Sequence, residues 1–85
     1  HAAHANQMAA HLETGLRKFS HVNILFPRQA NAVFAELPRP AIDGLRQRGW
    51  KFYTFIGQGG CRLMCAWDTT MADVDAFVSD LSGLV

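Results

Sequence analysis

Apolar residues recur every three or four positions at both ends of the chain, which predicts an amphipathic helix at each end. The first helix is expected over residues 1–18 and the last from residue 70 onward. At the start of the last helix, Thr70-x-x-Asp73 resembles a capping box, with Asp in place of the usual Glu. The repeating apolar positions are Met8, Leu12, Leu16 and Phe19 in the first helix, and Val74, Phe77, Val78 and Leu81 in the last.

Between these helices, short apolar stretches bounded by Pro and Gly indicate strands. The expected strands are 22–26, 32–37, 50–56 and 61–67. A helix over 40–49 separates the middle two, because Pro40 suits a first helical turn and Gly49 suits a C-terminal cap. The glycine-rich segment 57–60 leads into a strand, so a hairpin turn is favoured over a phosphate-binding loop. The order α-β-β-α-β-β-α indicates an α+β fold, with a small, mostly antiparallel sheet and helices on one face.

The last predicted strand has two unlike faces, because alternate side chains of a strand point in opposite directions. Its residues are Leu63, Cys65 and Trp67 on one side, and Arg62, Met64 and Ala66 on the other. We expect the first side to pack on helices and the second to meet another domain. A planar guanidinium on a rigid strand suits bidentate capture of a carboxylate. The alternative for Arg62 is a surface or ion-pair role.

Composition limits the choice of function. The 85 residues form one small domain, with 49% hydrophobic and 18% charged residues. The net charge is +1 and no basic stripe is present, so no nucleic acid partner is expected. No apolar run approaches the roughly 20 residues of a membrane span, so no membrane partner is expected. The chain opens without Met or a signal-peptide pattern, which suggests a fragment of a longer protein.

Few residues offer chemistry of their own. Cys61 and Cys65 would lie about 13 Å apart in a strand, too far for a disulfide, so we expect free thiols and a cytoplasmic location. His4 and His11 are two helical turns apart, about 10 Å, so a shared metal is not expected. The histidines, including His1, are expected at the surface or an interface. The aromatic residues of 50–56 are expected in the core or an interface, because no basic residues surround them.

Four segments, in order, resemble the C-terminal small domain of low-specificity L-threonine aldolases. This family is grouped with the β-eliminating lyases among fold-type I, aspartate-aminotransferase-like enzymes that depend on pyridoxal 5'-phosphate. The match spans nearly the whole chain. The segments are His4–Ala9, Gln29–Leu37, Leu45–Trp50, and Arg62–Asp68 continued by 73–75.

The resemblance implies a lyase that cleaves β-hydroxy-α-amino acids, such as threonine, into glycine and an aldehyde. It implies that Arg62 holds the α-carboxylate of the amino-acid substrate and that Asn31, in a matching strand, lines the site. The Schiff-base lysine and the other cofactor-binding residues would lie upstream, in a large domain of the same polypeptide. The chain alone, whose only lysines are Lys18 and Lys51, should therefore bind no cofactor and be inactive. The parent enzyme is expected to be a homo-oligomer.

Alternatives remain open at this point. Many family members have His at the position of Trp67, just before Asp68. This departure leaves open whether the reaction is aldol cleavage or belongs to another enzyme of the same fold, such as a β-eliminating lyase or an aminotransferase. A free-standing α+β binding module is a further alternative.

Overall fold

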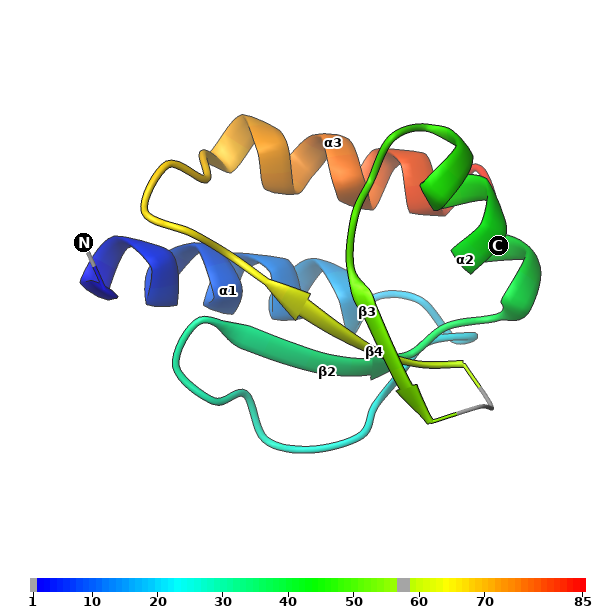
Figure 1. Cartoon of the computed structure of the whole chain (residues 1–85), viewed down its shortest axis with the longest axis horizontal. Coiled ribbons are helices and arrows are strands. Elements are labelled where there is room, and N and C mark those ends of the chain that lie inside the picture. Colours follow the sequence, from blue (N-terminus) through cyan, green and yellow to red (C-terminus); the bar gives the residue numbers. More distant parts are fainter. Residues whose placement is uncertain (1, 57–58) are drawn as a thin grey trace.

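The structure is a computed structural model that describes residues 2–56 and 59–85. Over these residues, three helices and four strands follow the predicted order α-β-β-α-β-β-α (Figure 1). They are α1 (Ala2–Leu16), β1 (Asn23–Ile24), β2 (Ala32–Glu36), α2 (Arg39–Gln47), β3 (Tyr53–Ile56), β4 (Gly60–Met64) and α3 (Met71–Ser82). The predicted α+β fold class is confirmed.

The strands form one antiparallel sheet with the spatial order β1-β2-β4-β3. Strands β2 and β4 are distant in sequence but pair from Ala32 opposite Met64 to Glu36 opposite Gly60. Strand β3 pairs with the other edge of β4. Because β4 is hydrogen-bonded on both sides, its backbone is held more firmly than that of an edge strand. A side chain on β4 therefore starts from a well-defined Cα position.

The helices cover one face of this sheet. Helices α1 and α3 run side by side, and α1 also contacts β2 (Figure 1). The cross-strand pair Val33 and Leu63 is buried in the same cluster as the apolar residues of all three helices. Full burial of each such side chain contributes about 1.5–3 kcal/mol relative to exposure. The largest fully buried side chains are Leu16, Leu37, Ile42, Leu45, Leu81, Val33 and Cys61.

The predicted glycine cap ends α2. Gly49 has a φ of 95°, which glycine adopts without steric strain. Its N–H donates to the carbonyl of Arg46 at 3.0 Å, and the N–H of Trp50 donates to the carbonyl of Leu45 at 3.1 Å. This pair of bonds is a Schellman motif, which satisfies carbonyls that the helix leaves unpaired. The cap turns the chain back toward β3.

The predicted capping box begins α3. The side chain of Thr70 accepts from the backbone N–H of Asp73 at 3.1 Å. In return, the carboxylate of Asp73 accepts from the N–H of Thr70 at 3.0 Å. Asp thus performs the reciprocal role that Glu usually has in this motif.

The strands are shorter than predicted. Strand β3 begins at Tyr53 rather than at residue 50, because Trp50 is taken up in the α2 cap. Strand β1 retains only two residues of the predicted five. The predicted turn at residues 57–60 lies partly outside the described residues.

The end of β4 corrects one prediction. The strand stops at Met64, and a turn follows in which Thr69 donates its N–H to the carbonyl of Ala66 at 3.1 Å. The hydroxyl of Thr69 accepts from the N–H of Ala66 at 2.8 Å. Leu63 is buried as predicted, but the prediction that Trp67 points the same way is wrong, since this side chain is 73% exposed.

Candidate functional site

Arg62 lies in the middle of the sheet face that carries no helices. Residues alternate between buried and exposed along β4, and Arg62 occupies an exposed position as predicted. The strand register places Phe34 of β2 on one side of Arg62 and Tyr53 of β3 on the other. Two aromatic residues therefore flank one cation on an open surface.

The guanidinium of Arg62 contacts a ring and leaves its donors free within the described chain. Its Cζ atom is 5.3 Å from the centroid of the Tyr53 ring. Among residues 2–56 and 59–85, no carboxylate lies within ion-pair distance of Arg62, and no hydrogen bond from its side chain is formed. A planar fork of N–H donors is thus available for an external carboxylate or phosphate.

The other arginines of the described residues have an acidic or carbonyl partner inside the chain. Four of them lie within ion-pair distance of acidic side chains, although Nε of Arg28 forms no hydrogen bond: Arg17 and Arg28 with Glu13 at 3.4 and 3.6 Å, Arg39 with Asp43 at 3.7 Å, and Arg48 with Asp80 at 3.2 Å. Arg46 donates to the backbone carbonyl of Phe52 at 3.1 Å. This difference argues against the simple ion-pair role that the sequence left open for Arg62.

Asn31 lies at the end of the same strand pair. The structure places it in the turn before β2, whereas the family resemblance implied a position within the matching strand. Its side-chain amide donates to the carbonyl of Cys65 at 2.7 Å, and its own carbonyl accepts from the N–H of Cys65 at 2.9 Å. Asn31 thus adds two hydrogen bonds to the pairing of β2 with β4, one residue beyond the end of β4. Cys65 is three positions from Arg62, or about 10 Å along the strand, so the two predicted site residues are not in contact.

An open hollow adjoins this end of β4. Large apolar side chains are exposed there, with Met64 at 50% and Trp67 at 73%. Exposed apolar groups that gather in one place are typical of a surface that another molecule covers. The hollow is lined by Ala2, Ala5, Asn31, Met64, Cys65, Ala66 and Trp67.

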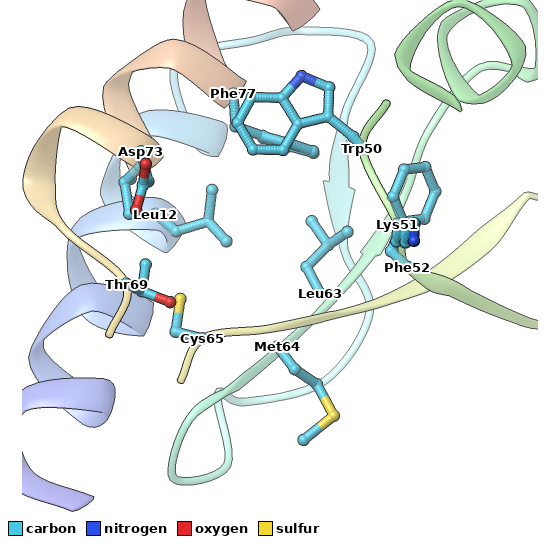
Figure 2. A pocket seen from close by; sticks show the side chains of 11 residues that line it. Leu12, Trp50, Lys51, Phe52, Leu63, Met64, Cys65, Thr69, Asp73 and Phe77 are labelled. Carbon is cyan, nitrogen blue, oxygen red and sulfur yellow. The ribbon is translucent and has the colours of Figure 1, made fainter. Parts of the chain in front are cut away.

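A second cavity, of about 200 Å³, lies on the helix side of the sheet (Figure 2). Trp50, Leu63 and Phe77 surround it, whereas Met64 points away from it. The rings of Trp50 and Phe77 meet edge to face at 5.2 Å, and the indole N–H donates to the carboxylate of Asp80 at 2.7 Å. Because its lining is mainly apolar and the indole donor is already used, this cavity suits core packing better than a polar amino acid.

The cysteines are unpaired, as predicted. Both are buried, and burial raises the pKa of the Cys61 thiol from 9.0 to about 11. Burial also raises the pKa of Cys65. A thiol that keeps its proton is a poor nucleophile and a poor metal ligand. Neither cysteine is therefore a candidate for catalysis.

His4 and His11 join α1 to α3 and to the turn before it. Nε2 of His11 contacts the carboxylate of Asp75 at 2.7 Å, which joins α1 to α3. Nε2 of His4 contacts the backbone carbonyl of Thr69 at 2.5 Å. His1, which was also expected at the surface or an interface, lies outside the described residues. Within that part, no three His, Cys, Asp or Glu side chains are grouped to hold a metal ion.

Known proteins with similar sequences and structures point to one enzyme class. No family model matches the chain. The chain is 45% identical, over all 85 residues, to 25% of the low specificity L-threonine aldolase of a Pseudomonas species. It is 47% identical over 81 residues, or 95% of its length, to 23% of the protein of the same name from Pseudomonas aeruginosa. A solved structure, threonine aldolase from Leishmania major, matches with a TM-score of 0.81 and 31% identity, over 96% of this chain and 25% of that chain.

The chain is therefore similar to one part of the threonine aldolases. More particularly, the predicted resemblance to the low-specificity L-threonine aldolases is confirmed. The chain spans about a quarter of the length of these curated relatives. Within the described residues, no helix is both long enough and apolar enough to cross a bilayer.

Proposed function

We propose that residues 1–85 are the C-terminal small domain of a larger, pyridoxal-phosphate-dependent aldolase. The enzyme would cleave β-hydroxy-α-amino acids, such as threonine, into glycine and an aldehyde. Whole-length similarity to part of two low-specificity L-threonine aldolases supports this assignment. The partner of the open sheet face would be the cofactor-binding domain of the same polypeptide, in a homo-oligomer located in the cytoplasm.

In this proposal, Arg62 binds the α-carboxylate of the substrate. The observation that carries it is the exposed guanidinium on central strand β4, with no carboxylate partner among the described residues. Its in-plane N–H groups can donate two parallel hydrogen bonds to the two carboxylate oxygens. Two such bonds fix the orientation of the amino acid as well as its position. Asn31 stays a predicted site residue at the end of the same strand pair.

We propose that the site for pyridoxal phosphate is formed by the large domain and not by these residues. Lys18 and Lys51 are both exposed, although Lys51 borders the helix-side cavity, whereas a Schiff-base lysine is usually desolvated in an apolar pocket. The cofactor, when bound, withdraws electrons from the α-carbon of the substrate. In our proposal, its binding groups come from the large domain, and this chain supplies the carboxylate anchor. No step through the cofactor is derived from this chain.

The test is Arg62→Lys in the full-length protein that carries this domain. Lysine retains the charge but not the fork, so kcat/KM for threonine should fall by about 30- to 150-fold, or about 2–3 kcal/mol. The matched control is Arg39→Lys, because Arg39 is exposed and pairs only loosely with Asp43 at 3.7 Å. A wild-type kcat/KM for Arg62→Lys contradicts the proposal. A loss explained by a lower melting temperature alone also contradicts it.

Product analysis separates aldol cleavage from the related reactions. The specific reason to include it is Trp67, an exposed residue where many relatives have His. Glycine and acetaldehyde from threonine indicate aldol cleavage. A keto acid with release of ammonia indicates β-elimination, and a keto acid formed only with an amino acceptor indicates transamination. No turnover by the full-length protein would favour a binding module.

A further inference from the structure

Tyr53 has no clear part in holding the domain together. It is 67% exposed on β3, and among the described residues its hydroxyl forms no hydrogen bond. The adjacent aromatic residue, Phe52, packs against the core and meets Phe77 edge to face at 6.3 Å. Two consecutive aromatic residues thus have opposite environments. The core explains Phe52 but leaves the exposed ring of Tyr53 without a structural reason.

The one contact that distinguishes Tyr53 is with Arg62. The two residues are directly opposite each other in the β3–β4 register, and the Arg62 Cζ atom is 5.3 Å from the ring centroid. In such a contact the positive charge is attracted to the π face of the aromatic ring. The ring has no carbonyl or carboxylate oxygen, so this contact does not occupy the N–H donors in the way that an acidic side chain would. An acidic partner would instead occupy those donors.

We propose that Tyr53 is a positioning residue for Arg62. This inference rests on the proposed function of Arg62 as the carboxylate anchor. An exposed arginine loses considerable rotamer freedom when it binds a ligand. The ring of Tyr53 restricts the guanidinium before the substrate arrives, which lowers that loss and strengthens binding. The role belongs to the ring, not to the hydroxyl group.

The test compares Tyr53→Val with Tyr53→Phe in the full-length holoenzyme. Valine keeps high strand propensity but removes the ring, whereas phenylalanine keeps the ring. For Tyr53→Val, the KM for threonine and the Kd for glycine, measured by calorimetric titration, should each rise by about two- to fivefold. kcat should change little. Tyr53→Phe should remain within twofold of the wild type in all these quantities, and both melting temperatures should be close to the wild-type value.

A double-mutant cycle identifies the partner. When Arg62 is already lysine, Tyr53→Val should have little further effect on the Kd for glycine, because the planar fork that the ring would position is gone. If Tyr53→Val has the full effect in that background, the coupling to Arg62 is refuted. If Tyr53→Phe is as impaired as Tyr53→Val, the hydroxyl group acts instead of the ring. Tyr53→Thr is the second ring-free variant, should Tyr53→Val fail to fold.

The two proposals can fail separately. If Arg62→Lys leaves KM and Kd unchanged, the carboxylate-anchor function fails, and the positioning role fails with it. If Arg62→Lys is impaired but Tyr53→Val and Tyr53→Thr bind glycine as the wild type does, only the positioning role of Tyr53 is overturned.

Discussion

Two arginine–aromatic pairs meet near the start of β3, one between α2 and the residue before the strand and the other within the sheet. On the helix side, the Cζ atom of Arg46 is 5.1 Å from the ring centroid of Phe52. On the open side, Arg62 makes nearly the same approach, 5.3 Å, to the next residue, Tyr53. Arg46 also donates to the carbonyl of Phe52 at 3.1 Å, whereas Arg62 has no acceptor among the described residues.

The comparison teaches that stacking alone does not indicate function. Both contacts have similar Cζ–centroid distances, and each contributes about 0.5–1 kcal/mol at an exposed site. The two contacts differ in whether the arginine N–H groups have an acceptor and in whether the ring packs against the core. Phe52 is joined to the core, so Arg46 completes a structural contact. Tyr53 is exposed, so Arg62 can present its donors to a ligand.

The largest expected effect tests the difference between the two sides of β3. Phe77→Ala removes a buried ring that meets both Trp50 and Phe52, so it should reduce the free energy of unfolding by about 3–5 kcal/mol. Tyr53→Val, on the open side, should change it by less than about 0.5 kcal/mol. Urea unfolding followed by tryptophan fluorescence measures both. Equal losses would show that the open face is part of the structural core.

A smaller effect concerns the two sides of β4. The pKa of the Cys61 thiol is raised from 9.0 to about 11, so the folded state retains the proton at a pH where the unfolded state loses it. The stability contributed by this neutral thiol is complete below pH 9 and is lost as the pH rises toward 11. The loss should reach about 2 kcal/mol at pH 11.

Denaturant unfolding at several pH values between 8 and 11 checks this. Cys61→Ala lacks the titrating group and is the matched control, so its stability should fall less steeply over the same range. Parallel curves for the two proteins would mean that Cys61 ionises equally well in the folded state. Arg62→Lys, which changes the exposed neighbour on the same strand, should follow the wild-type curve.

The smallest effect compares the arginines directly. Arg46→Ala should lower the free energy of unfolding by about 1 kcal/mol, because a hydrogen bond and a ring contact are lost. Arg62→Ala should lower it by only about 0.5 kcal/mol, the lower end of the range for an exposed ring contact, because no hydrogen bond is lost. Thermal unfolding of both variants measures the difference. A larger loss for Arg62→Ala would assign Arg62 a structural role.

The sequence predicted the helices and their caps well, because these depend on local chemistry. Gly49 and the pair Thr70 and Asp73 carry signals within a few residues of the helix ends. The end of β4 could not be predicted in the same way. It depends on Asn31, which is distant in sequence, and on the turn closed by Thr69, so extending the alternation to Trp67 failed.

The candidate site was only partly predictable. Arg62 was identified from its strand position and from the family resemblance. Its lack of an acidic partner within the described residues depends on where the acidic side chains lie in space, which no local pattern reveals. The separate environments of Phe52 and Tyr53 follow from alternation along a strand, so that signal was present in the sequence. Expecting all the aromatic residues of 50–56 in the core or an interface hides this difference.

Strand order has a consequence for how the domain forms during synthesis. Strand β4 comes after the other strands in sequence but lies between β2 and β3 in the sheet. Until residue 64 has been made, β2 lacks its central partner and presents an unpaired edge. Such edges can pair with a strand of another chain. Closure also requires contacts between positions about 30 residues apart, which are slow to form. The arginine that we assign to the site therefore reaches its place between two strands only after this long-range pairing of β2 and β4 has formed.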